Sequence, residues 1–163
     1  YFIVDKERDE EGKIISSTYI REMLADGNII KANKLLGYYY FVTGTVQHGN
    51  AIGHTKLYPT ANLIPPAVKH LPKFGVYVTR VTVDGKTYGG LTNVGAKPTI
   101  SGENPVGVET YLYNFEGDLY GKDMKVELLD FVRPEMKFES IDALKAQLDH
   151  DIKECQRRYL EFA

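Results

Sequence analysis

The dipeptide Asp84-Gly85 constrains the fold more than any other feature of this chain. It separates residues 75–83 from residues 86–93, and both segments are rich in β-branched and aromatic residues. Asp-Gly is favoured in the two-residue turns of β-hairpins, because both central residues there adopt positive φ. The sequence therefore predicts two antiparallel strands joined by a tight turn.

Further segments have the composition of strands, at residues 40–47, 108–115 and 123–132. Turn residues separate them, as in the Gly- and Pro-containing run at 102–105. Five or six antiparallel strands in under about a hundred residues favour a small closed barrel, because closure leaves no exposed strand edge. The predicted fold class is mainly β.

Two short helices are predicted before the barrel. A Ser or Thr within residues 16–18 caps the first, which stops near residues 26–28. The second covers residues 29–36 and ends at Gly37, a natural residue for a helix C-terminus.

A long C-terminal helix begins after Ser140, which is a suitable N-cap. Apolar residues recur along it at steps of three and four, and this stripe is predicted to pack on the barrel. The stripe consists of Ile141, Leu144, Leu148, Ile152, Cys155, Tyr159 and Phe162.

Composition narrows the class of protein. With 163 residues, 43% hydrophobic and 26% charged, the chain suits one ordinary domain with a packed core. A net charge of −2 argues against a nucleic-acid-coating surface but leaves nucleotide substrates open. The single Cys excludes an intramolecular disulfide and a multi-Cys zinc site. A single Cys also suits a reducing cytosol, so we expect a cytoplasmic protein. No apolar run approaches the ~18 residues that span a bilayer, so we expect no membrane partner.

Candidate ligand-binding residues are concentrated in one part of the sequence. Gly44, Gly49 and Gly53 would let the backbone approach a ligand, or would serve as bends of the barrel. Thr60 and Asn62 lie two residues apart, so both side chains point the same way on an extended segment. A hydroxyl and an amide oxygen suit Mg²⁺ already held by phosphates. A Pro-Thr turn with side-chain capping explains the same residues.

Glu109 is the candidate general base. On a strand of period two it shares a face with Tyr111, Tyr113 and Phe115. A carboxylate beside aromatic rings is partly desolvated, which raises its pKa and makes it a better proton acceptor. A rim glutamate paired with Lys or Arg is the competing interpretation.

Taken together, the motifs resemble the riboflavin kinase domain of bacterial bifunctional FAD synthetases over nearly the whole chain. Residues 15–21 resemble the end of the adenylyltransferase module that precedes this kinase. The motifs occur in the family's order and are Gly44-Thr45-Val46-Gln47-His48-Gly49, Pro59-Thr60-Ala61-Asn62, Phe74-Gly75-Val76-Tyr77, Asn93-Val94-Gly95, Val108-Glu109-Thr110 and Arg133-Pro134-Glu135-Met136-Lys137-Phe138.

The resemblance implies a six-stranded antiparallel Greek-key β-barrel with a long C-terminal α-helix and a short helical N-terminal segment. It implies that residues 1–37 are the end of the adenylyltransferase module and a linker, and that residues 38–163 are the kinase domain. Its expected partner is the adenylyltransferase domain of a longer parent chain that also makes FAD. We expect a fragment of that parent, because the chain starts without Met.

The implied reaction transfers the γ-phosphoryl group of Mg·ATP to the ribityl 5′-hydroxyl of riboflavin, giving FMN. In this comparison Glu109 matches the base, and Thr60 and Asn62 match the Mg²⁺ ligands. The implied residues for ATP and its phosphates are Gly44, Val46, His48, Gly49, Gly53, His54, Lys56, Pro59, Thr60 and Asn62. The implied flavin-binding residues are Arg133, Ile141 and Asp142.

The sequence departs from the family's pattern at a few positions. Leu57 stands where a glycine is usual, and a leucine at positive φ would be strained. His54 replaces an arginine, and Tyr111 replaces a histidine. These departures leave two alternatives open. One is a barrel that binds flavin or nucleotide with weak or no kinase activity, and the other is a β-barrel interaction domain.

Overall fold

The computed structural model describes residues 16–47, 60–65, 71–96 and 106–162. Within these ranges the chain forms six strands and three helices. The strands are β1 (Phe41–Thr45), β2 (Ala61–Leu63), β3 (Gly75–Val83), β4 (Lys86–Ala96), β5 (Val106–Leu112) and β6 (Asp123–Pro134). The helices are α1 (Ser17–Asp26), α2 (Ile29–Leu36) and α3 (Ile141–Phe162).

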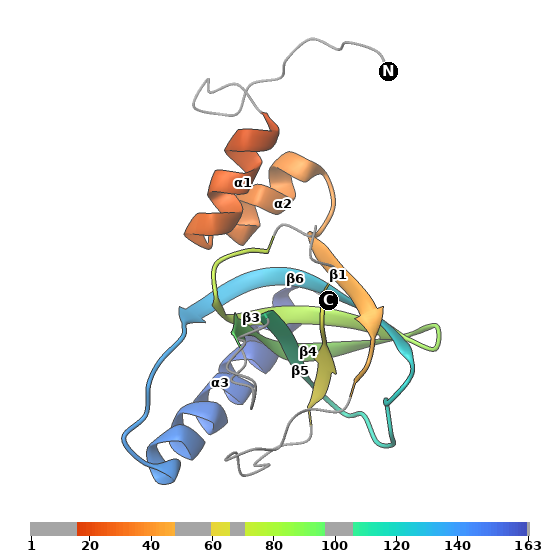
Figure 1. The fold of residues 1–163 in the computed structure, drawn as a ribbon, viewed down its shortest axis with the longest axis vertical. Helices are drawn as coiled ribbons and strands as arrows, with labels where there is room; N and C mark the ends of the chain where they lie inside the picture. Colours follow the sequence, from red (N-terminus) through yellow and green to blue (C-terminus); the bar gives the residue numbers. More distant parts are fainter. Residues whose placement is uncertain (1–15, 48–59, 66–70, 97–105, 163) are drawn as a thin grey trace.

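The strands form one antiparallel sheet in the order β1-β6-β3-β4-β5-β2, which curls into a barrel (Figure 1). Consecutive strands β3, β4 and β5 pair as neighbours, and β6 returns to lie beside β3, which is the Greek-key arrangement. The two edges approach each other where Gln47 bridges to Asn62, with 2.8 Å between the Gln47 nitrogen and the Asn62 oxygen. The predicted mainly β, six-stranded barrel with a C-terminal helix is confirmed.

The hairpin predicted at Asp84-Gly85 joins β3 to β4. Both residues have positive φ, 53° at Asp84 and 74° at Gly85, as the two-residue turn requires. Val83 and Lys86 close the turn as register partners. The turn therefore fixes the pairing of β3 with β4 along the barrel wall.

Alternate residues of each strand face opposite sides of the sheet. Inward-facing residues such as Val81, Val94, Val108 and Val126 form the core of the barrel and are essentially inaccessible to solvent. A second, smaller cluster lies on the outer face beneath α3 and includes Val78, whose side chain is fully buried. The outer face of the sheet is therefore partly solvated and partly covered by a helix.

Both N-terminal helices have the predicted caps. The Ser16 side chain accepts a hydrogen bond from the Tyr19 backbone N–H, and Gly27 ends α1 at φ 81°. Helix α2 covers the predicted residues and ends at Gly37. The side-chain amide of Asn33 donates to the Leu128 carbonyl oxygen at 2.8 Å, which fastens α2 to strand β6.

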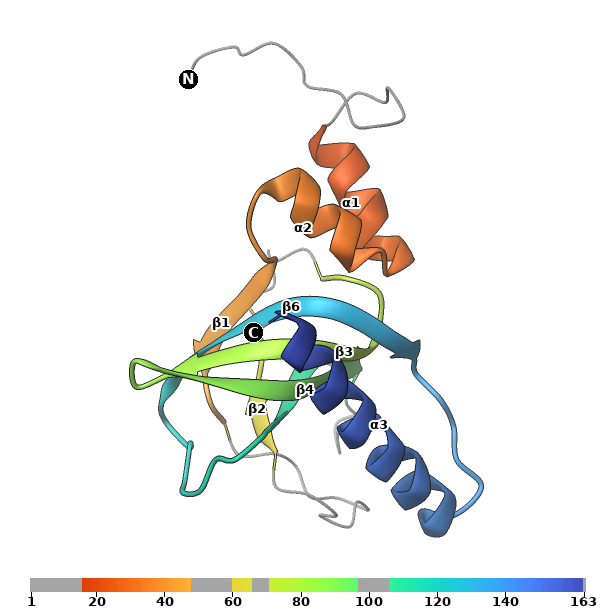
Figure 2. The same ribbon diagram turned by 180° about the vertical axis from the view of Figure 1, so that it is seen from behind.

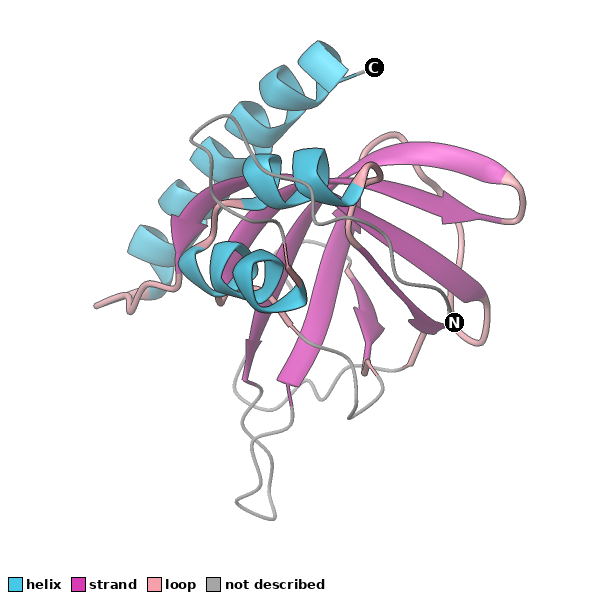
Figure 3. Ribbon diagram, turned by 90° about the horizontal axis from the view of Figure 1, so that it is seen from above, coloured by secondary structure: helices cyan, strands magenta, loops and turns pink. Residues whose placement is uncertain are grey.

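Helix α3 runs along the outer face of the barrel (Figures 2 and 3). Ser140 caps it, because its hydroxyl oxygen accepts from the Ala143 N–H at 3.1 Å. Ile152, Cys155 and Tyr159 pack in the outer cluster as the stripe predicted. The first residue of the stripe is an exception, because Ile141 is 60% exposed.

The predicted fifth strand is too long at its C-terminal end. Strand β5 stops at Leu112, and Asn114 adopts a φ of 59° in the turn that follows. Phe115 consequently leaves the face of Glu109 and packs edge-on against Tyr88, with ring centroids 5.3 Å apart. Period-two alternation predicted the strand but not the residue at which the chain turns.

Among the residues described, none of the helices combines the length and apolar character that a membrane crossing needs.

The first prediction concerns Cys155, the single cysteine of the chain. Its side chain is fully buried, and burial raises the pKa of the thiol from about 9 to about 12. The nucleophilic thiolate is therefore scarce at pH 8, and reaction with a thiol reagent should be at least about 100-fold slower in native protein than in urea. Rapid stoichiometric labelling of the native chain would contradict the packing of α3.

Candidate active site

Residues from three neighbouring strands form a line across the outer face of the barrel. Asn62 of β2 lies opposite Glu109 of β5, and Glu109 lies opposite Asn93 of β4. Their sequence neighbours Ala61, Val108 and Val94 face the core, so these three side chains point outward. We call Asn62, Glu109 and Asn93 the polar row.

The Glu109 carboxylate is held by a hydroxyl. Thr60, just before β2, donates its Oγ1 hydrogen to Glu109 Oε1 at 2.7 Å. Thr60 is exposed, Glu109 is half-buried and Asn62 is 9% exposed. The structure thus brings the hydroxyl of Thr60 and the amide of Asn62 next to the carboxylate of Glu109, which lies 49 positions after Thr60 in the sequence.

Two glycines leave bare backbone beside the polar row. Gly95 and Gly107 are register partners on the same outer face, two residues along β4 and β5 from Asn93 and Glu109. A Cβ added at Gly95 would lie 1.9 Å from Oε1 of Glu135, so this carboxylate rests directly on the backbone. The glycines therefore make room for groups other than strand side chains.

Arg133 stands farther along the same line of register partners. Val76 of β3 pairs with Asn93 on one side and with Arg133 of β6 on the other. The Arg133 guanidinium donates to both carboxylate oxygens of Asp151 in α3, at 2.7 Å for the shortest contact. Asp151 is fully buried and also accepts from Gln147. Arg133 therefore ties α3 to the barrel.

The other predicted flavin-binding residues lie at the start of α3. Ile141 and Asp142 occupy its first turn and are exposed. Figure 1 shows this end of α3 extending past the sheet. Their role in flavin binding stays a prediction.

Gly44 and Val46 are the predicted ATP-binding residues in and beside β1. Gly44 borders a hollow of about 500 Å³ whose wall also includes Thr43, Thr45 and Asp123. Val46 is buried in the core, and its backbone N–H and C=O bond to Lys122 and Gly121 respectively. The other predicted nucleotide residues lie outside the described part of the chain, and they are His48, Gly49, Gly53, His54, Lys56 and Pro59.

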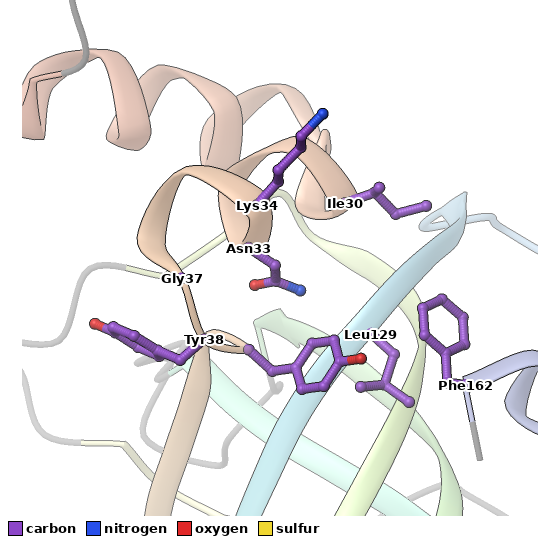
Figure 4. Close-up of a pocket in the computed structure, with 8 residues that line it drawn as sticks. Ile30, Asn33, Lys34, Gly37, Tyr38, Leu129 and Phe162 are labelled. Carbon is purple, nitrogen blue, oxygen red and sulfur yellow. The ribbon is translucent and has the colours of Figure 1, made fainter. Parts of the chain in front are cut away.

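A second hollow, of about 430 Å³, lies at the C-terminal end of α3 (Figure 4). Tyr38 and Tyr39 line it with Phe162, the last residue of α3, and Lys34 stands at α2. None of the predicted site residues borders this hollow. Its position separates it from the polar row.

The sequence motifs alone did not predict that Asn93 lies opposite Glu109. The antiparallel register would have identified it, because the residue directly opposite Glu109 lies on the same face of the sheet. That register depends on the Asp84-Gly85 turn and on the path of β5. The sequence pattern alone did not predict the path of β5 to the exact residue. Within the described residues, no group of three or more His, Cys, Asp or Glu side chains has the arrangement of a metal site.

Comparison with known proteins shows the family to which the chain belongs. The family model described as "Flavokinase: Riboflavin kinase" matches residues 36–159. A bifunctional riboflavin kinase/FMN adenylyltransferase from Listeria monocytogenes is 38% identical over 149 residues, which is 91% of this chain and 47% of that protein. The chain thus spans about half the length of the curated relatives it matches.

Solved structures extend the comparison to the fold. A Streptococcus pneumoniae structure described as a macrolide-efflux protein matches with a TM-score of 0.82 and 40% identity, covering 94% of this chain and 50% of that chain. Riboflavin kinase from Trypanosoma brucei matches with a TM-score of 0.53 and 22% identity, covering 72% and 75% respectively, and this likeness shows the fold alone. The chain belongs to the riboflavin kinase family.

The buried ion pair gives the second prediction. Replacing Arg133 by Met leaves the Asp151 carboxylate buried without its partner, which should lower the free energy of unfolding by about 3–5 kcal/mol in urea denaturation. Arg157→Met is the matched control, because Arg157 is 60% exposed and pairs only on the helix surface. That control should cost under about 1 kcal/mol.

A second substitution separates the ion pair from general damage to β6. Adding Asp151→Leu to Arg133→Met removes the unpaired charge and should restore most of the lost stability. Equal losses in Arg133→Met and Arg157→Met would show that the pair does not hold α3.

Proposed function

We propose that this chain transfers the γ-phosphoryl group of Mg·ATP to the ribityl 5′-hydroxyl of riboflavin, giving FMN and ADP. The observation that carries this proposal is the Thr60–Glu109 hydrogen bond at 2.7 Å beside Asn62, its cross-strand neighbour. Membership of the riboflavin kinase family supports the same reaction. ATP as donor and Mg²⁺ as metal belong to the proposal.

Glu109 acts as the general base in this mechanism. The 5′-hydroxyl oxygen forms a bond to the γ-phosphorus while the bond from that phosphorus to the bridging oxygen breaks, so ADP leaves with the electron pair. The hydroxyl proton passes to the Glu109 carboxylate. Thr60 holds Oε1 of Glu109, which orients the carboxylate before the substrate arrives.

Thr60 and Asn62 fit a magnesium ion that is bound mainly by phosphate and water. Both offer hard, neutral oxygen ligands on one side of Glu109, and an Mg²⁺–nucleotide complex needs few protein ligands. When bound, Mg²⁺ neutralises charge on the phosphates. The residues themselves contribute position: an exposed hydroxyl from Thr60 and an amide from Asn62, whose backbone is fixed in β2.

The alternative of a binding barrel with weak or no kinase activity is less well supported. It was based on Leu57 and His54, which depart from the family's pattern and lie outside the described part of the chain, whereas an interaction domain would use Thr60, Asn62 and Glu109 only structurally. A barrel that used them structurally would have no need of an exposed hydroxyl on a half-buried carboxylate at the surface. The family match supports catalysis as well.

The whole protein's activity is a further part of the proposal. Because the bifunctional relatives are about twice as long, we infer that the parent chain carries an FMN adenylyltransferase domain before this one and makes FAD in the cytoplasm. Residues 1–37 would be the end of that domain and the linker, and residues 38–163 the kinase domain. Leu24 and Ile29 contribute to the barrel core, so α1 and α2 are expected to be needed for stability of the kinase.

Chromatographic detection of FMN tests the proposed function directly. The purified chain should convert riboflavin to FMN only when both ATP and Mg²⁺ are present, and removal of Mg²⁺ with a chelator should stop the reaction. Riboflavin binding by a folded sample without FMN formation would instead favour the binding barrel.

Glu109→Gln is the third prediction. The amide keeps the shape of the side chain but cannot accept the proton, so kcat should fall at least about tenfold, or ~1.4 kcal/mol of transition-state stabilisation, with little change in thermal unfolding. Glu116→Gln is the matched control, because Glu116 is an exposed glutamate in the turn after β5. Wild-type turnover in Glu109→Gln would remove Glu109 from the role of base.

A further inference from the structure

We propose that Asn93 binds the secondary hydroxyls of the acceptor's polyol side chain and so makes the enzyme select a ribityl chain over a plain alkyl alcohol. The inference rests on the proposed function and concerns a residue to which the family motifs had given no role. It follows from which side of Glu109 each neighbour occupies.

The register places Asn93 on the opposite side of Glu109 from Asn62. Glu109 pairs with Asn62 across β2 and with Asn93 across β4. Thr92 and Val94 are fully buried and face the interior, so the Asn93 side chain points to the outer face. Directly opposed residues have Cβ atoms about 4.5–5.5 Å apart, within reach of one bound molecule.

The chemistry of phosphoryl transfer assigns a substrate to each side. The attacking and leaving oxygens stand roughly in line on opposite sides of the transferred phosphorus. Thr60 and Asn62 offer phosphate and metal ligands on the β2 side. The acceptor must then approach Glu109 from the β4 side, where Asn93 stands.

The surroundings of Asn93 suit a polyol chain. Gly95 and Gly107, next to the row, carry no side chains, and the carboxylate of Glu135, a hydrogen-bond acceptor, lies over Gly95. Beyond Asn93 the line of partners reaches Val76, in the apolar cluster beneath α3. On the β3 side the polar row is therefore bordered by a buried apolar residue.

The Asn93 amide is available for such contacts. Within the described part of the chain its side chain makes no hydrogen bond, and the residue is half-buried. Asn33 shows the contrast, because its amide both donates to the Leu128 carbonyl and accepts from the Tyr40 N–H and is thus used for folding. An amide can both donate to and accept from neighbouring hydroxyls, which matches a polyol.

A substrate-by-mutant cycle tests this inference. The two acceptors are riboflavin and an isoalloxazine whose N10 carries a 5-hydroxypentyl chain, which keeps the terminal hydroxyl and lacks the three secondary ones. Asn93→Ala should lower kcat/KM for riboflavin about tenfold or more and change it less than about twofold for the hydroxypentyl analogue. The KM for ATP should stay the same.

Two further variants make the outcome interpretable. Thr87→Ala, at an exposed position of the same strand, controls for damage to β4 and should leave both acceptors unaffected. Asn93→Leu, which is close to Asn in size, repeats the test if the alanine variant unfolds. Thermal unfolding of each variant verifies that the barrel is intact.

Each result supports or overturns the inference. Loss confined to riboflavin supports it. Equal loss with both acceptors shows that Asn93 acts on the base or on the fold, and unchanged kcat/KM with both shows that it lies outside the acceptor site; either result overturns it. Failure of the proposed function is distinguishable, because the wild-type chain would then make no FMN.

Discussion

The antiparallel pairing of β5 with β2 and β4 is the constraint on which the site depends. Side chains alternate between the two faces of a strand, so a slip of one residue would turn Glu109 into the core and bring a valine or threonine to the outer face. The pairing is therefore held firmly. Val94 and Val108, which are opposed and fully buried, would lose their apolar environment in any slipped register.

Hydroxyl groups inside the barrel add a second determinant of the same register. Oγ1 of Thr92 lies 2.9 Å from Oγ1 of Thr79 and 2.8 Å from Oγ1 of Thr110, and the three side chains are inaccessible to solvent. A buried hydroxyl without a partner is costly, so each of these bonds penalises a shifted strand. Thr92 and Thr110 adjoin Asn93 and Glu109 in sequence. The strand register that forms the buried hydroxyl network therefore also aligns the polar row on the outer face.

Helix α3 is packed against the barrel along its later turns and is exposed at its first turn. Its later turns are fixed, because Arg158 bonds to Asp130 of β6 and Tyr159 lies on bare backbone at Gly89. Asp151 marks the last strong tie towards the N-terminus, through Arg133. The turns before it lie past the sheet, and Ile141 remains exposed there. An apolar stripe of period 3.6 predicts where a helix can be buried, but the extent of the surface beneath it decides how much of the stripe is covered.

The same distinction explains what the sequence predicted. Local signals such as Asp84-Gly85, the Ser16 and Ser140 caps and Gly37 identified elements that the structure confirms, because each depends on a few neighbouring residues. The predicted end of β5 was wrong by three residues, because the turn at Asn114 contains no glycine that would indicate it in the sequence.

The pairing of strands with one another was harder to predict from the sequence. Neither the hydrogen bond from Thr60 to Glu109 nor the pairing of Asn93 with Glu109 was predicted, because strand pairing depends on the closed sheet as a whole.

The charges on the described side chains around Glu109 determine how much counter-charge must arrive with the substrates. The polar row and Thr60 offer neutral oxygen and nitrogen atoms and one carboxylate, and Glu135 adds a second carboxylate over Gly95. The cation nearest along the line of register partners, Arg133, is already engaged by Asp151. A triphosphate is strongly anionic and would be repelled by these carboxylates, so among the described residues the proposed reaction relies on the metal for neutralisation. In the proposed reaction the neutral ligands Thr60 and Asn62 would position a metal–phosphate complex without competing for its charge, and the Glu109 carboxylate, held by Thr60, would accept the proton as the new ester bond forms.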